Sequence, residues 1–187
     1  NSSSEQHIQT GPASRYQQYN GTHRWVVSPS ASAGALPSDI TAMTIDISGR
    51  VTIPNQPALS IRHNTGPLNF AVGDSFFATT GVIKHTDKGG ITHNTSNGRF
   101  TVPVAGTYHV GFHTMQENGT SGFYLMLNGT ALTQTYDTNT GYWNNQAATV
   151  IMTCAANDYI SIQCAQIGAT KTAHGDVHSE LSIHLIG

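Results

Sequence analysis

The sequence has few charged residues, few cysteines and no long hydrophobic run. Only 10% of its 187 residues are Asp, Glu, Lys or Arg, the formal net charge is −2, and the basic residues nowhere form a block. We therefore expect no binding to nucleic acid, which relies on neutralising phosphates. No apolar stretch approaches the ~20 residues that a membrane-spanning helix needs, so we also expect no membrane insertion.

The chain contains two cysteines, Cys154 and Cys164. They flank a turn-forming sequence at residues 155–158. If that turn joins a simple hairpin, Cys154 lies opposite Tyr159, and a disulfide to Cys164 would have badly stretched geometry. We therefore expect two buried free thiols, so the cysteines give no argument for an oxidising compartment.

Glycine, threonine, serine and asparagine are abundant, which is typical of an all-β protein with many turns. From residue 58 onward, stretches with strand character follow one another at short, even spacing. They are residues 58–63, 69–72, 77–84, 91–93, 98–103, 107–115, 122–127, 130–136, 145–154, 158–167 and 178–186. The chain shows no heptads and no internal repeat. This pattern predicts a jelly-roll β-sandwich over residues 58–187.

The first 57 residues have a different character. Residues 1–24 are polar and predict an extended arm, and the Ser-, Pro- and Gly-containing residues 28–34 predict a flexible linker. Residues 41–47 and 50–53 alternate between apolar and polar on either side of a Ser-Gly turn, which is the signature of a β-hairpin. The sequence thus predicts two parts, residues 1–57 and residues 58–187.

The most specific motif lies in residues 98–113. Apolar and polar residues alternate up to Val104 and again from Tyr108, on either side of the turn Ala105-Gly106. The run Phe, five residues, Gly-x-Tyr-x-Val-x-Phe resembles the signature of the C1q globular head within the tumour-necrosis-factor-like fold. Further segments similar to this family follow in the expected order: residues 82–90, 125–130, 155–159 and 178–186. The resemblance covers residues 67–187.

This resemblance implies a homotrimer in which one sheet of each subunit faces the threefold axis. Independently, several strands carry apolar residues on both faces, so closing the sandwich leaves apolar surface that marks an interface. The predicted interface residues are His109, Gly111, His113, Tyr124, Met126, Ile151 and Ile186.

On the trimer model, His109 and His113 lie near their symmetry mates, and the alternative is that both face solvent. Crowded imidazoles favour their neutral forms, so acid is expected to loosen the trimer. No carboxylate or cysteine accompanies these histidines, so we predict no metal site.

A second resemblance lies in residues 46–58, which include Ser-Gly-Arg-Val-Thr-Ile-Pro-Asn-Gln-Pro. This segment is similar to a junction in bacteriophage tail fibres that precedes a globular tip. It implies a virion structural protein at the virion surface, assembled in the host cytoplasm, with residues 1–57 attached to the capsid or fibre shaft. The alternatives are a capsid decoration protein and a secreted C1q-like lectin or signalling ligand.

No hydrolase, metalloprotease or nucleotide-binding motif is present, so we expect neither an enzyme nor a cofactor. Residues 137–141 resemble part of a calcium loop, but they lack its later acidic ligand, which favours a turn. Aromatic residues around this loop offer flat faces for a host surface glycan or protein, and packing in the core or interface is the alternative. The predicted receptor contacts are Tyr136, Asp137, Asn139, Tyr142 and Trp143.

Overall fold

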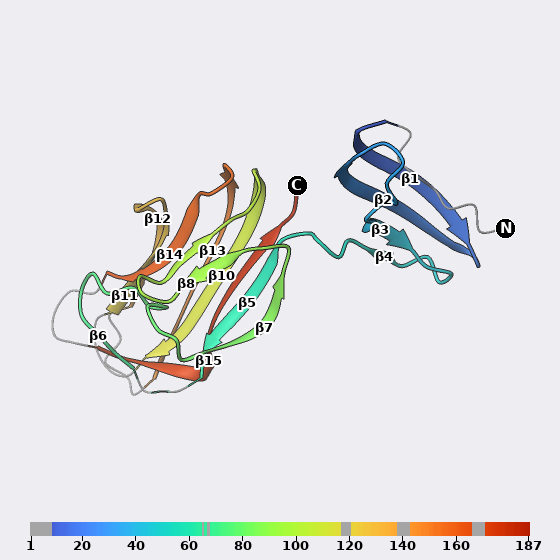
Figure 1. The fold of residues 1–187 in the computed structure, drawn as a ribbon. Coiled ribbons are helices and arrows are strands. Elements are labelled where there is room, and N and C mark those ends of the chain that lie inside the picture. Colours follow the sequence, from blue (N-terminus) through green and yellow to red (C-terminus); the bar gives the residue numbers. More distant parts are fainter. Residues whose placement is uncertain (1–8, 65, 67, 117–120, 138–142, 166–170) are drawn as a thin grey trace. The chain divides into compact units, whose positions relative to one another are not determined.

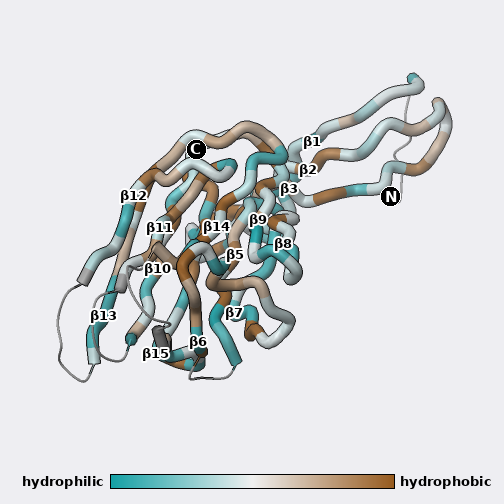
Figure 2. Tube along the Cα trace, turned by 90° about the vertical axis from the view of Figure 1, so that its left-hand side faces the viewer, coloured by the Kyte–Doolittle hydropathy of each residue, from teal (hydrophilic) through white to brown (hydrophobic). Residues whose placement is uncertain are grey.

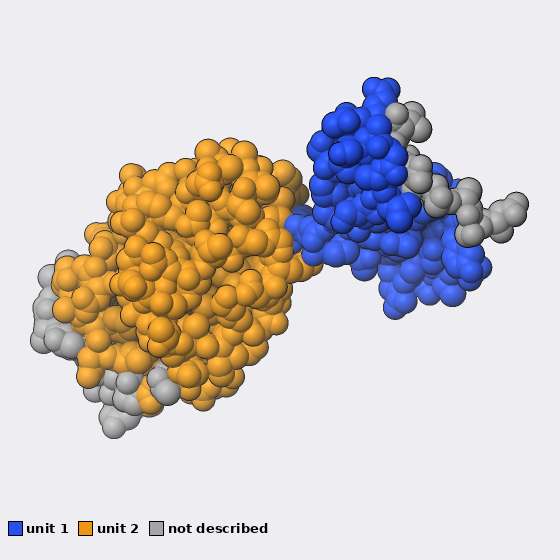
Figure 3. All heavy atoms as spheres, in the orientation of Figure 1, with its two compact units in different colours: residues 1–56 blue, residues 57–187 orange. Residues whose placement is uncertain are grey.

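The computed structural model describes residues 9–187 except 65, 67, 117–120, 138–142 and 166–170. The described residues form strands and turns without any helix (Figure 1). Within these ranges there is accordingly no helix of the length and hydrophobicity that crossing a bilayer requires. The chain separates into two compact units, residues 1–56 and residues 57–187 (Figure 3).

The first unit is an antiparallel sheet of four strands in sequence order. The strands are β1 (Gly11–Tyr19), β2 (Thr22–Ala31), β3 (Ile40–Ile45) and β4 (Val51–Thr52). The predicted hairpin forms between β3 and β4, where Ile45 pairs with Val51. The Asp46 carboxylate closes its turn by accepting hydrogen bonds from the backbone N–H groups of Ser48 and Arg50.

The predictions of an extended arm over residues 1–24 and a linker over residues 28–34 are wrong for residues 11–19, 22–24 and 28–31, which lie in β1 and β2. Asn20 and Gly21 both have positive φ, 48° and 74°, the backbone of a two-residue turn that suits strand twist. This turn pairs Tyr19 with Thr22 and brings together two strands that are mostly polar. Apolar support comes from Val26, which is buried.

The second unit, which we call the head, contains two sheets that form the predicted β-sandwich. The first, the β10 sheet, has the strand order β13 (Asn144–Cys154), β10 (Gly106–Gln116), β15 (Lys171–Leu185), β5 (Ala58–His63) and β7 (Val82–Lys88), with β6 (Leu68–Phe70) paired to β15. The second, the β11 sheet, has the order β12 (Thr130–Asp137), β11 (Ser121–Leu127), β14 (Tyr159–Cys164), β9 (Arg99–Thr101) and β8 (Thr92–Asn94).

The core lies between these two sheets. Strand β10 shows the predicted alternation: Tyr108, Val110 and Phe112 are buried, and the residues between them are half-buried on the other face. Figure 2 shows β7, with its Lys, His and Asp residues, as largely hydrophilic. Burial of one face of each central strand supplies the main driving force for folding of the head.

Phe76 and Phe77 are adjacent in sequence, yet both are buried in the core. Consecutive side chains of a strand point to opposite faces, so a regular strand cannot place both there. They lie in a turn in which the N–H of Ala78 donates to the carbonyl of Ser75, and β7 begins only at Val82. The predicted strand over residues 77–84 is therefore wrong in its first half.

Cys154 and Cys164 are free and buried, as predicted. The conditional hairpin at residues 155–158 does not form, because Cys154 ends β13 of one sheet and Cys164 ends β14 of the other. Burial raises the pKa of the Cys154 thiol, and nearby Asp158 adds to this rise. Cys154 is therefore a protonated, apolar core residue at neutral pH.

Candidate functional site

The outward side of the β10 sheet contains three rows of paired residues that we call the histidine face. In each row, one β10 residue lies between a β13 residue and a β15 residue. The rows are Ile151–His109–His184, Thr149–Gly111–Ser182 and Ala147–His113–Glu180. The side chains in these rows are small, apolar or imidazole, apart from the carboxylate of Glu180.

The first row ends in exposed apolar surface. Ile151 is 64% exposed, and Ile186, which follows β15, is 53% exposed. The rings of His109 and His184 stack nearly parallel, with centroids 6.5 Å apart and planes at 4°. This row is therefore a flat surface of two imidazoles beside an isoleucine.

The second row is depressed because Gly111 has no side chain. A Cβ atom added there would lie 3.1 Å from the Ser182 Oγ, which itself donates to the Gly111 carbonyl oxygen at 3.4 Å. A larger residue would have to displace the serine. The sequence predicts that this small residue lets another subunit approach closely, and that role of Gly111 stays a prediction.

The third row contains the carboxylate of the face. Glu180 accepts a hydrogen bond from the Ser60 Oγ on β5 at 2.6 Å, so its carboxylate is held against the sheet. His113 pairs with Glu180 across the strands. Among the described residues, no cluster of three or more His, Cys, Asp or Glu has the geometry to bind a metal ion.

Two predicted interface residues do not belong to this face. Tyr124 and Met126 lie on β11, in the other sheet, where they alternate with the core residues Phe123 and Leu125. The structure therefore brings together His109, Gly111, His113 and Ile151, with Ile186 beside them, and separates Tyr124 and Met126 from them. Alternation within one strand shows two apolar sides, but it does not show to which sheet the strand belongs.

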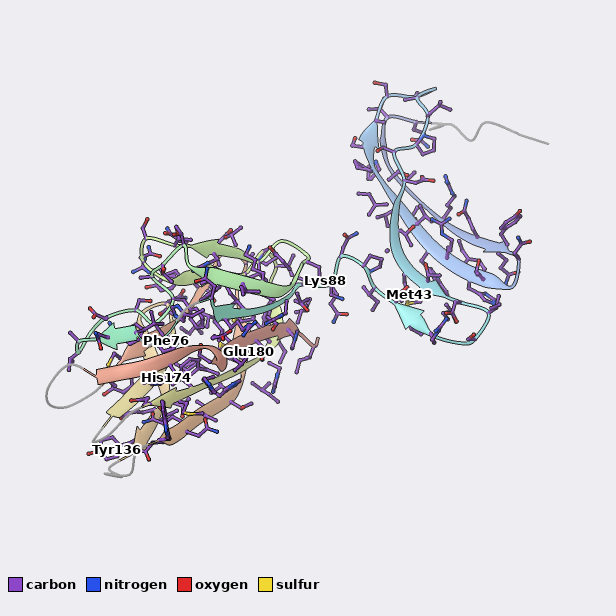
Figure 4. All side chains as sticks on the ribbon, turned by 90° about the horizontal axis from the view of Figure 1, so that it is seen from below. Met43, Phe76, Lys88, Tyr136, His174 and Glu180 are labelled. Carbon is purple, nitrogen blue, oxygen red and sulfur yellow. The ribbon has the colours of Figure 1, made fainter. Side chains whose placement is uncertain are left out.

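The predicted receptor contacts fall on different elements. Tyr136, labelled in Figure 4, and Asp137 end β12. Tyr136 is 55% exposed. Trp143 precedes β13, and its ring meets the ring of His174 on β15 edge to face at 4.2 Å. Asn139 and Tyr142 lie outside the described residues.

A concavity on the outward side of the β11 sheet was missed by sequence reasoning. We call it the Arg99 pocket; its volume is about 470 Å³. It is lined by Gly73, Asp74, Ser75, Ala78, Ser96, Asn97, Arg99, Met126, Gly129, Tyr159, Ser161 and Gln163. No sequence signal marks it, because strands β9, β11 and β14 and the turn at residues 73–78 each contribute only a few residues.

Comparison with known proteins identifies the fold. A family model described as the C1q domain matches residues 87–186, which is more than half of the chain. This match begins after residues 46–58 and so does not include the segment that resembles phage fibres. Among curated proteins, none matches the chain significantly.

Solved structures with the same fold come from several animals. Eiger TNF from S. frugiperda has a TM-score of 0.60 at 12% identity, with 71% of this chain and 94% of that chain covered. The globular domain of zebrafish complement 1qA has a TM-score of 0.55 at 21% identity, with 71% and 98% covered. Murine APRIL at pH 5.0 has a TM-score of 0.53 at 12% identity, with 70% and 99% covered. These likenesses confirm the predicted C1q/tumour-necrosis-factor-like jelly roll.

Proposed function

The chain belongs to the C1q domain family, and we propose that it is a non-enzymatic binding head that works as a homotrimer. Trimers are typical of this family, and its domains are generally not enzymes. The observation that carries the proposal is the histidine face, in which Ile151 is exposed beside small and imidazole side chains. Two further copies of the same surface would cover it.

The histidine face suits a self-association surface for two reasons. Glu180 is its one carboxylate, and the hydrogen bond from Ser60 offsets part of the cost of removing that charge from water when the surface is covered. Fully burying an isoleucine side chain contributes roughly 1.5–3 kcal/mol, and a trimer repeats this gain three times. Gly111 and Ser182 allow the neighbouring sheets to approach closely.

A matched pair of variants tests the trimer interface. Ile151→Asp places a charge on the histidine face, and Leu132→Asp places one at a 42% exposed position on β12, in the other sheet. We expect the first variant to sediment as a folded monomer and the second to keep the wild-type mass. A trimer that tolerates Ile151→Asp would contradict this use of the β10 sheet.

The loosening of the trimer by acid also stays a prediction. Sedimentation at pH 5 and pH 8 tests it, and we expect a smaller fraction of trimer at pH 5.

For the finer role, we propose the tip of a bacteriophage tail or head fibre that binds a receptor on the host surface. Support comes from residues 46–58, whose sequence resembles the segment preceding such tips, and from the folded N-terminal unit, which offers a surface for attachment to the virion. Binding to whole host cells tests this role. It should weaken in Trp143→Ala and Tyr136→Ala if these exposed aromatic residues contact the receptor, whereas exposed Val72→Ala should leave binding unchanged.

Two alternatives have their own tests. A capsid decoration protein would bind purified capsids and lose that binding when residues 1–40 are deleted. A secreted ligand fits the family and the fold equally well, and it would bind animal or bacterial cells without any need for the N-terminal unit. Binding to purified capsids that is lost with residues 1–40 would favour the decoration protein, and binding to animal cells that survives this deletion would favour the secreted ligand over a fibre tip.

A further inference from the structure

The Arg99 pocket contains a guanidinium group that lies over an aromatic ring. Arg99 begins β9, and its Cζ atom lies 4.1 Å from the centroid of the Tyr159 ring. Stacking on an aromatic face holds the planar group and leaves its N–H donors at the edge. Among the described residues, Arg99 forms no ion pair, in contrast to Arg15, Arg50 and Arg62. Its charge is therefore available to a ligand.

The remaining lining residues supply groups that hydrogen-bond to hydroxyls. Ser96, Asn97 and Ser161 line the pocket. The turn that forms one wall is held in place, since the N–H of Ala71 donates to the Asp74 carboxylate and the Gln163 side chain donates to the Gly73 carbonyl oxygen. A carboxylate such as that of Asp74 accepts hydrogen bonds from several hydroxyls at once. A ligand with many hydroxyls suits this wall.

Apolar contacts complete the pocket. Met126 and Ala78 line it together with the polar groups, and such atoms suit the C–H face of a sugar ring. The volume, about 470 Å³, is typical of sites for small ligands. Met126, which the sequence predicted in the trimer interface, thus lies in a different sheet from the histidine face.

We propose that the Arg99 pocket binds an acidic sugar residue, with its carboxylate on Arg99 and its hydroxyls on the wall around Asp74. A guanidinium binds a carboxylate through two parallel hydrogen bonds. The negative charge of Asp74 disfavours a doubly charged phosphate more than a singly charged carboxylate, because like charges in the same small pocket repel one another. The inference rests on the proposed function in treating the chain as a binding head, and it names the ligand class.

The test uses the full chain with defined sugars. Isothermal titration or NMR titration measures binding of N-acetylneuraminic acid and glucuronic acid, with glucose, acetate, inorganic phosphate and a short acidic peptide as comparison probes. We expect an acidic sugar to bind more tightly than glucose or acetate, and its binding to weaken as salt is added. Equal binding of acetate, or tighter binding of phosphate or peptide, would overturn the assignment, as would the absence of sugar binding.

Three variants place the ligand. Arg99→Gln should weaken binding of the acidic sugar by about tenfold or more, the effect of losing a charged hydrogen-bond pair. Ala78→Trp fills the pocket from an exposed position without altering Arg99 and should abolish binding. Lys88→Gln, at an exposed position on β7 of the other sheet, is the charge-matched control and should bind like wild type. Thermal unfolding of each variant shows that the head is folded.

The result of the sugar-binding test can be distinguished from the result of the test for the trimer. Sedimentation of the same samples gives the oligomeric state independently of the sugar. Trimers without sugar binding would overturn the pocket assignment alone, and monomers that bind the acidic sugar would overturn the trimer alone. If Arg99→Gln bound the acidic sugar as tightly as the wild type does, Arg99 would not hold its carboxylate, and the proposal would be overturned.

Discussion

His63 and His93 hold two consecutive residues of the same turn. The Nε2 of His63 lies 2.7 Å from the carbonyl oxygen of Phe76, and the Nε2 of His93 lies 2.9 Å from that of Phe77. His63 is on β5 of the β10 sheet, and His93 is on β8 of the β11 sheet. The two imidazoles therefore fasten the turn to both layers of the sandwich.

This arrangement predicts that the head loses stability in acid. Burial is the main cause that lowers the pKa of both His63 and His93, although the bond to each carbonyl opposes the shift. The unfolded chain thus binds protons more readily than the folded chain as pH falls below about 6.5, the unperturbed value. The free energy of unfolding should be highest above that pH and decrease as pH falls from it through the lower folded-state values. Urea denaturation at pH 8, 6.5 and 5 measures this slope.

The variant His93→Gln isolates one contribution to that slope. A glutamine amide can still donate to the Phe77 carbonyl, but it does not titrate. We expect the free energy of unfolding of this variant to depend less on pH than that of the wild type. The control is His85→Gln, in which the pH dependence should be unchanged, since His85 is exposed on β7. Stability that is equal at pH 5 and pH 8 in the wild type would contradict this explanation.

Phe76 lies at the centre of the aromatic core. Its ring packs against His63, Phe70, Phe77, Phe112 and Phe123 with centroid distances of 4.9–5.3 Å. Phe76→Ala should lower the free energy of unfolding by about 3–5 kcal/mol, because the surrounding rings cannot fill the cavity.

Two other variants frame this prediction. Phe76→Leu should cost roughly 1–3 kcal/mol, and Val72→Ala, which is 61% exposed on the same connection, should change stability by at most about 0.5 kcal/mol. Chemical denaturation compares the three. Similar losses for Phe76→Ala and Val72→Ala would show that the turn does not anchor the core.

Gly21 tests whether the N-terminal sheet folds as the structure shows. Its φ is +74°, and a Cβ added there would lie 2.9 Å from the Cγ2 atom of Ile47. Gly21→Ala should destabilise the turn by roughly 1–2 kcal/mol for the left-handed backbone, plus the cost of displacing Ile47. Hydrogen exchange of residues 11–31 should then accelerate while exchange in the head stays unchanged.

Gly34 provides the matched control for that variant. Its φ is +83°, but a Cβ there meets nothing within 4 Å. Gly34→Ala should therefore show the backbone cost without the contact, and the effect should be smaller than for Gly21→Ala. Equal, negligible effects on exchange at both positions would support the extended arm that the sequence first suggested.

The fold of the head could be predicted because its central strands follow a simple rule. Residues 108–112 alternate between large apolar residues and His or Gly and carry part of the family motif, and the structure shows the same alternation in burial. The N-terminal strands could not be predicted in this way. Their residues are mostly polar, and the pairing depends on the turn at Asn20-Gly21 and on a few apolar contacts around Val26.

The site residues were predicted only in part, for a topological reason. The pattern of β11 shows that Tyr124 and Met126 point away from the core, but their membership of the second sheet follows from pairing with β12 and β14. The Arg99 pocket likewise requires Arg99 to meet Tyr159, which is 60 positions away in the sequence. Local periodicity contains neither relationship.

Sedimentation equilibrium of the wild-type chain at micromolar concentration tests the central claim most directly. A homotrimer has three times the chain mass of 19.9 kDa, and we expect this species throughout a dilution series at neutral pH. A folded species with the mass of one chain, stable with Ile151 and the histidine face in contact with water, would contradict the account.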